Sequence, residues 1–100
     1  MSHFAVMAWD VDDSAPIRDA ARAAHFVHIA RIIDKVAVAG PLKDATGTII
    51  GSLVVLDVAD AEEAESVFRS DPYFDAGVWQ RWTIHPFVAA AGEWVGGKIW

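Results

Sequence analysis

The sequence predicts a single α+β domain with the element order βαββαβ. Runs rich in β-branched and aromatic residues alternate with two segments of helical pattern, and the connections between them are short. A chain of 100 residues with 54% hydrophobic and 22% charged content also has room for only one core. This order is the split βαβ or ferredoxin-like arrangement, in which a four-stranded antiparallel sheet carries two helices on one face.

The first two predicted elements are a strand over residues 3–11 and a helix that runs to about Lys35. The strand is rich in Phe, Val, Met and Trp and ends in an acidic turn. Asp13 or Ser14 can cap the helix, and Pro16 falls in its first turn, where the missing N–H costs nothing. The alanine-rich sequence that follows favours helix.

This predicted helix carries an apolar stripe that we expect to face the core. At 100° per residue, His25 lies roughly 90° from the centre of the stripe and His28 roughly 150° away. His25 is therefore expected to border the core and His28 to face solvent. From the residues alone, an ordinary structural histidine remains the simpler interpretation of His25. The stripe consists of Phe26, Ile29, Ala30 and Ile33.

A hairpin and a second helix are predicted next. Residues 36–41 form a short strand, residues 43–47 a polar turn, and residues 48–58 a strand rich in Ile and Val. Asp60 can cap a helix over residues 61–69, where the apolar residues recur at helical spacing.

An extra helical turn is predicted over residues 71–77. Asp71 followed by Pro72 is typical of an N-cap with proline at the first helical position, and Gly77 is a natural stop. The fold brings the end of the second helix back toward the sheet. A carboxylate in that cap can therefore also face a pocket.

The last strand is predicted over residues 79–88, with Pro86 placing its end at a sheet edge. The helix-free face then lacks a cover, and five Trp, five Phe and one Tyr exceed what one small core hides. We expect a homodimer formed through this face, with the segment 92–100, which holds Trp94 and Trp100, packed across the partner or the barrel end.

Composition excludes several classes of function. A net charge of −6 and no basic stripe argue against nucleic acid as a partner. The absence of cysteine fits a cytoplasmic protein, and an N-terminus that reaches Asp10 without a long apolar run predicts neither a signal peptide nor membrane insertion. No metal-ligand spacing or phosphate-binding glycine loop is present, so we expect no metal and no cofactor.

Five short motifs follow one another over most of the chain: Arg22-Ala-Ala-His25; Ala39-Gly40-Pro41-Leu42 with Asp44 and Gly47; Gly51-Ser52; Asp71-Pro72-Tyr73 with Ala76-Gly77; and Ile84-His85-Pro86-Phe87. Their order and spacing resemble the YCII-related family, from Phe4 to about Val88. The resemblance implies a dimeric ferredoxin-like α+β barrel similar to muconolactone isomerase. We expect one domain over residues 1–100, with its core at about 3–88 and a tail at 89–100.

The resemblance also implies an active-site pair, which falls on His25 and Asp71. An aspartate bonded to one imidazole nitrogen fixes the tautomer and leaves the other nitrogen to move a proton. We expect Ser52 and the backbone near Gly40 to bind a polar oxygen of a substrate.

An aromatic side chain is expected to stack on a substrate ring, and the candidates are Tyr73, Phe74 and Trp9. The predicted function is a small cofactor-free enzyme acting on a small, aromatic or cyclic metabolite by lyase, isomerase or dehalogenating elimination chemistry. A chlorinated-hydroquinone dehydrochlorinase resembles the family. Two alternatives stay open: a non-catalytic dimeric module that binds a small molecule or a partner protein, and a cofactor-independent monooxygenase.

Overall fold

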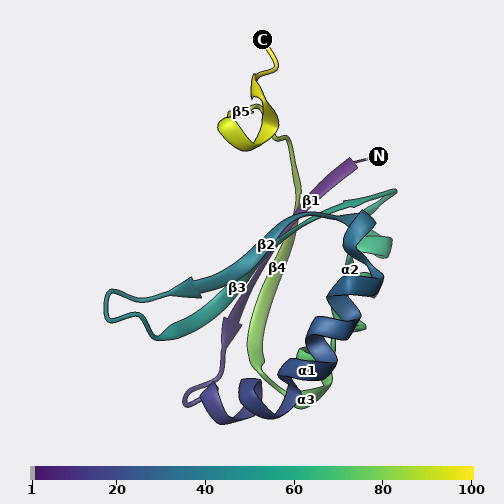
Figure 1. The fold of residues 1–100 in the computed structure, drawn as a ribbon. Coiled ribbons are helices and arrows are strands. Elements are labelled where there is room, and N and C mark those ends of the chain that lie inside the picture. Colours follow the sequence, from purple (N-terminus) through teal and green to yellow (C-terminus); the bar gives the residue numbers. More distant parts are fainter. Residues whose placement is uncertain (1) are drawn as a thin grey trace.

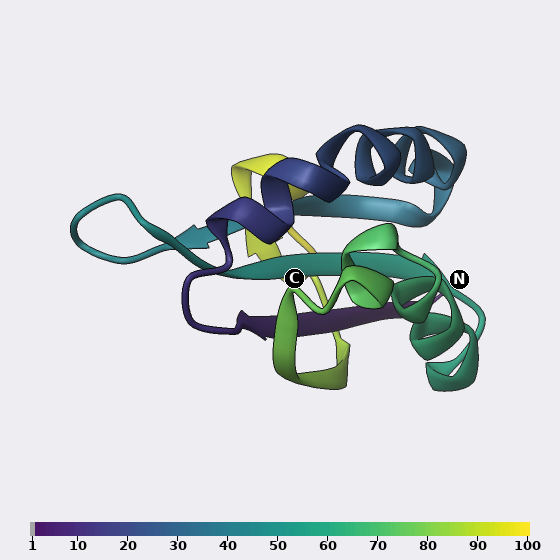
Figure 2. The same ribbon diagram turned by 90° about the horizontal axis from the view of Figure 1, so that it is seen from below.

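The computed structural model describes residues 2–100, and it confirms the predicted fold class. A four-stranded antiparallel sheet has the order β2-β3-β1-β4, and its helices lie on one face (Figures 1 and 2). Within the described residues, no helix has the length and apolarity needed to cross a membrane. The strands are β1 (Ser2–Asp10), β2 (Val36–Lys43), β3 (Ile49–Val58) and β4 (Trp79–Phe87), and the helices are α1 (Ala15–Arg31), α2 (Ala61–Arg69) and α3 (Pro72–Ala76).

The hydrophobic core lies between the sheet and the helix layer. Side chains of a strand alternate between the two faces of the sheet, and in β1 the fully buried positions are Phe4, Val6 and Ala8. Leu56, which pairs with Phe4 across the sheet, and Phe68 of α2 join the same cluster. The alternate residues of β1 are only partly covered, and they belong to the helix-free face.

Both ends of the α2–α3 segment form as the sequence predicts. Asp60 accepts a hydrogen bond from the Glu63 backbone N–H at 2.9 Å, while the Glu63 carboxylate accepts one from Ala59 N–H at 2.8 Å. This reciprocal cap fixes the start of α2. Asp71 caps α3, and Gly77 ends it with φ of 81°, a left-handed conformation that favours glycine.

α1 differs from the prediction in its length and in its cap. It ends at Arg31 and is followed by a 3₁₀ turn, η1 (Ile33–Lys35). Ser14 occupies the N-cap position, but its hydroxyl donates to Asp10 rather than accepting from the helix. The helix start is therefore anchored to the end of β1.

The predicted core-facing stripe of α1 is wrong. Phe26 and Ile33 are each 61% exposed, whereas the buried residue of the helix is Arg18. The physical reason is that α1 packs on the core through Ile17 and Ala21, which lie on the opposite side of the helix from the predicted stripe. Phe26 and Ile29 instead line an open cavity between α1 and β2.

β4 is an edge strand, as Pro86 predicted, and Pro86 pairs with Phe4. After β4 the chain leaves the sheet and forms a small separate hairpin, which stands away from the rest of the molecule in Figure 1. Trp94, Ile99 and Trp100 are strongly exposed there. The hairpin consists of β5 (Ala91–Gly92), a 3₁₀ turn η2 (Glu93–Val95) and β6 (Gly97–Lys98).

Candidate active site

His25 and Asp71, distant in sequence, meet where α1 packs beside α3. The Nδ1 atom of His25 lies 2.8 Å from Asp71 Oδ1 and 2.9 Å from Oδ2. Both side chains are largely buried. The expected contact is therefore present, and the catalytic role of the pair remains a prediction.

The N-cap of α3 aims the carboxylate of Asp71. Its Oδ1 atom also accepts the backbone N–H of Tyr73 at 2.9 Å, so one oxygen both caps the helix and contacts the imidazole. An ionised carboxylate can only accept hydrogen bonds, so in the neutral imidazole Nδ1 carries the hydrogen. The Nε2 atom of His25 then presents a lone pair, and within residues 2–100 it has no hydrogen-bond partner.

Tyr73 holds the imidazole from its flat side. The two rings stack with centroids 3.9 Å apart and an interplanar angle of 8°. The ring of Trp79 meets the Tyr73 ring edge-on, with centroids 6.0 Å apart. The Arg18 guanidinium lies 5.1 Å from the centroid of the Tyr73 ring. The Tyr73 ring thus packs against the histidine, and its stacking on a substrate remains a prediction.

A cavity of about 340 Å³ opens at this pair. Five of the predicted site residues line it, namely His25, Asp71, Tyr73, Ser52 and Gly40. Trp9 does not, since it lines another cavity of about 720 Å³ and lies under the guanidinium of Arg81. Phe74 packs on Phe68 and Trp82 and does not line the His25 cavity.

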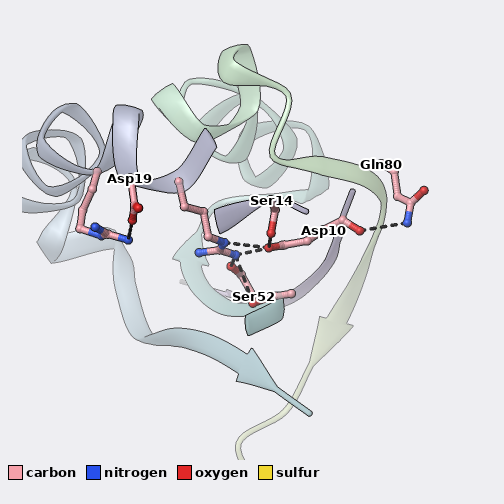
Figure 3. A network of polar contacts seen from close by, with 8 residues as sticks. Asp10, Ser14, Asp19, Ser52 and Gln80 are labelled. Atoms are coloured by element: carbon pink, nitrogen blue, oxygen red, sulfur yellow. Dashed lines mark hydrogen bonds and ion pairs between the residues drawn. The ribbon is translucent and has the colours of Figure 1, made fainter. Parts of the chain in front are cut away.

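A second polar cluster, formed by Asp10, Ser14, Arg18 and Ser52, lies beside the cavity (Figure 3). Its ion pair is not among the predictions from the sequence. Arg18 Nε and Nη2 donate to the two oxygens of Asp10 at 2.8 and 2.9 Å, and Nη2 also donates to Ser52 Oγ at 3.1 Å. Ser14 Oγ donates to Asp10 at 2.6 Å. The signal was available, because strand alternation places Asp10 on the same face as Val6, and Ser14 and Arg18 follow it at intervals of four residues.

The described residues contain no group of three His, Cys, Asp or Glu side chains that could hold a metal ion. The lining itself holds an imidazole nitrogen without a hydrogen-bond partner in the described residues, besides hydroxyl and guanidinium donors. The hydroxyl of Ser52 accepts from Arg18, which leaves its own hydrogen available to a ligand.

The comparisons with solved structures agree with this fold. The chain is similar to 5-chloro-2-hydroxyhydroquinone dehydrochlorinase from Burkholderia phenoliruptrix, solved in complex with 2,5-dihydroxybenzoquinone. The identity is 25% and the TM-score 0.80, with 91% of this chain and 96% of that chain covered. A structure described as an antibiotic biosynthesis monooxygenase from Chloroflexus aurantiacus has 16% identity and a TM-score of 0.50, with coverage of 91% and 98%, and shows the fold alone. No curated protein matches the sequence.

The sequence itself matches the family model of the YCII-related domain over residues 2–88. This range contains all four strands of the main sheet, the three α-helices and every residue of the cavity. It stops before the small C-terminal hairpin. The chain therefore belongs to the YCII-related domain family.

Proposed function

We propose that the protein is a small cofactor-free enzyme that uses His25 and Asp71 as a general acid/base pair on a small cyclic metabolite. The single observation that carries this proposal is the geometry of the pair. One imidazole nitrogen is held by a carboxylate at 2.8 Å, the other has no hydrogen-bond partner within residues 2–100, and the residue lines a cavity. A histidine with a fixed tautomer and a free nitrogen is suited to proton transfer.

In this proposal Nε2 of His25 takes a proton from a hydroxyl or an acidic C–H group of the substrate. The imidazolium that forms is stabilised by the carboxylate of Asp71, and the proton is then returned to the substrate or released. The stacked ring of Tyr73 keeps the imidazole in one orientation throughout. Holding the base in place in this way removes the entropic cost of aligning it with the substrate.

The cavity suits a ring that carries oxygen substituents. Its walls include the apolar side chains of Phe26, Ile29 and Val54, and Ser52 offers a hydroxyl. The similar dehydrochlorinase was solved with 2,5-dihydroxybenzoquinone, a compound of this kind. We therefore favour dehalogenating elimination. One hydroxyl proton of the ring moves to the carbon that carries chlorine, a second hydroxyl proton leaves, and the C–Cl bond breaks. Two C=O bonds and one C–H bond form, and a proton and a chloride ion are released. The reaction transfers no electrons to or from a carrier.

The test is chloride release from a panel of chlorinated hydroxyhydroquinones, measured for the wild type and for His25→Ala. We expect release by the wild type and its loss in the variant. The matched control is His28→Ala, since His28 lies on the same helix outside the cavity lining. Ring compounds that bind without any turnover would instead favour the non-catalytic binding module.

We also propose that the protein is a homodimer formed through the helix-free face of the sheet. Leu53 and Val55 lie on this face beside a cleft of about 490 Å³ that the C-terminal hairpin borders through Trp94 and Val95. A hairpin of two short strands is not stable alone in water, so its exposed tryptophans call for a covering surface. Sedimentation equilibrium at micromolar concentration should give twice the chain mass of 10.9 kDa. A monomer at that concentration would contradict the proposal.

A further inference from the structure

The cavity at His25 has a charge opposite to that of the whole protein. The chain has a formal net charge of −6, yet the ionisable side chains that line the cavity are Arg18, Arg22, His25 and Asp71, besides the phenol of Tyr73. Asp71 is already paired with His25. Two guanidinium groups therefore border a small cavity in an acidic protein, and the attraction of each for an anion depends on its own ion-pair partner.

The two arginines are bound in different ways. Arg18 is buried and makes two short bonds to Asp10, so its charge is neutralised and its position fixed. Arg22 makes one bond, from Nη2 to Asp19 Oδ1 at 2.7 Å, and both partners are well exposed. Exposed ion pairs contribute little free energy, so Arg22 can leave Asp19 at small cost.

Arg22 is also placed to reach a ligand on His25. It lies three residues before His25, which puts both side chains on neighbouring positions of the same helix face. The pKa of Arg22 is raised, mainly by its hydrogen bond to Asp19, and Tyr73, whose ring covers His25, contributes to the same effect. Arg22, His25 and Tyr73 all line the same cavity.

We infer that the cavity selects a ring substrate that bears an anionic oxygen, and that Arg22 recognises this charge by exchanging Asp19 for the substrate. The inference rests on the proposed function of the same cavity. A guanidinium presents several donors in a plane and binds an oxyanion more strongly than a neutral group. Its effect is larger at a partly enclosed cavity than in open water, because the local dielectric constant is lower.

The other polar groups of the lining fit a substrate rich in acceptor oxygens. Ser52 has a hydroxyl hydrogen to donate, because its oxygen accepts from Arg18. Trp79 lines the cavity, and its buried Nε1 has no acceptor within residues 2–100. Buried donors are normally satisfied, and an acceptor oxygen bound in the cavity satisfies the Ser52 hydroxyl.

The test measures binding, so it does not depend on turnover. The dissociation constants of 2,5-dihydroxybenzoquinone, whose ring hydroxyls are acidic, and of uncharged 2,5-dimethoxybenzoquinone are measured by calorimetry at neutral pH. The proteins are the wild type, Arg22→Gln and Asp19→Asn, with circular dichroism as the check on folding. The matched control is Arg69→Gln, because Arg69 forms a similarly exposed pair with Glu65 on α2, outside the cavity lining.

We expect the wild type to prefer the anionic compound and Arg22→Gln to weaken its binding roughly ten- to a hundredfold, with no change for the dimethoxy compound. Asp19→Asn should tighten binding of the anion by up to about fivefold, the value of an exposed ion pair. Added salt should weaken binding of the anion to the wild type more than to Arg22→Gln. Arg69→Gln should bind like the wild type.

Three results would overturn the inference: equal affinity of the wild type for the two compounds, no binding of either, or wild-type affinity of Arg22→Gln for the anion. The catalytic proposal fails separately. Charge-selective binding without turnover of any substrate would keep the role of Arg22 and remove the acid/base chemistry. Turnover together with charge-indifferent binding would do the reverse.

Discussion

Two polar pairs join helix α1 to its neighbours, and they differ in what they leave unbonded. Arg18 and Asp10 bond to each other twice, and Ser14 and Ser52 take up further positions on the same groups. His25 and Asp71, two turns further along the helix, are similarly close. There, however, one ring nitrogen remains without a partner in the described part of the chain.

The difference separates a group that holds the fold from a group that can react. A buried ion pair in which both carboxylate oxygens of Asp10 are bonded by Arg18 contributes a fixed position to the fold. A pair that orients one atom and leaves another open keeps the capacity to exchange a proton. Arg18 and His25 both lie on helix α1. The Arg18–Asp10 pair fixes the start of this helix and so helps to position His25 further along it.

Removing Arg18 should have the largest effect on stability. Arg18→Met leaves the Asp10 carboxylate buried without its partner, and we expect the free energy of unfolding to fall by about 3–5 kcal/mol. Urea denaturation measures it. Arg22→Gln, four residues away on an exposed pair, should lose no more than about 1 kcal/mol. Similar losses in the two variants would contradict a structural role for the buried pair.

Removing His25 should lower the catalytic rate strongly and the stability only slightly. His25→Gln should lower kcat by roughly 10²–10⁴-fold on a substrate that the wild type turns over, because the proton acceptor is gone. Its free energy of unfolding should fall by only about 1–2 kcal/mol, because Asp71 keeps its hydrogen bond from the Tyr73 backbone N–H. Steady-state kinetics beside urea denaturation distinguishes the two effects. Full activity in His25→Gln would remove the histidine from the chemistry.

Replacing the orienting carboxylate should give a smaller loss of rate. Asp71→Asn keeps an oxygen that can cap α3, so we expect little change in the thermal unfolding midpoint. The amide is neutral and no longer fixes the tautomer, and kcat should fall by about 10²-fold. Ser66→Asn, a substitution elsewhere on the second-helix segment, is the control for kinetics. An Asp71→Asn variant with undiminished turnover would reduce the aspartate to a helix cap.

Gly77→Ala tests whether the orientation depends on the end of α3. Gly77 has φ of 81°, and no heavy atom lies within 4 Å of an added Cβ, so the cost comes from the backbone conformation alone. We expect a loss of about 1 kcal/mol in the free energy of unfolding with the fold retained. A stability equal to that of the wild type would show that the left-handed conformation is not needed.

The smallest effect is expected at the β2–β3 turn, far from both pairs. The pKa of Asp44 is lowered, first by the hydrogen bond from the Thr46 side chain and then by backbone N–H groups. A depressed carboxyl pKa contributes stability above its ordinary value of 3.8 that is lost as the pH falls through the lower folded value. The thermal midpoint of Asp44→Asn should therefore depend less on pH in this acidic range. An unchanged pH profile would contradict this.

The sequence was informative where local chemistry decides the structure. The boundaries of α2, the Asp71 cap and the Gly77 stop follow from residues that act on their own neighbours. The meeting of His25 with Asp71 came from the family resemblance combined with a topology that sets two helices on one face. Neither residue alone indicated it.

The errors came from assuming that apolar residues on a helix always face the core. The inward face of α1 holds Arg18 and His25, while Phe26 borders an open cavity. A hydrophobic pattern does not distinguish a core from a pocket wall, because both bury apolar atoms. Trp9 was expected at the same site as His25. Alternation along β1 instead puts its side chain on the face of the sheet away from Ala8 and the helices.

The shared oxygen of Asp71 makes the backbone amide of Tyr73 a spectroscopic reporter. That amide donates to Oδ1, the same atom that contacts the imidazole. Its proton exchange with deuterated solvent should slow while the helix turn and the imidazole contact are intact, and quicken when either is lost. The state of the pair can thus be followed by NMR without a substrate.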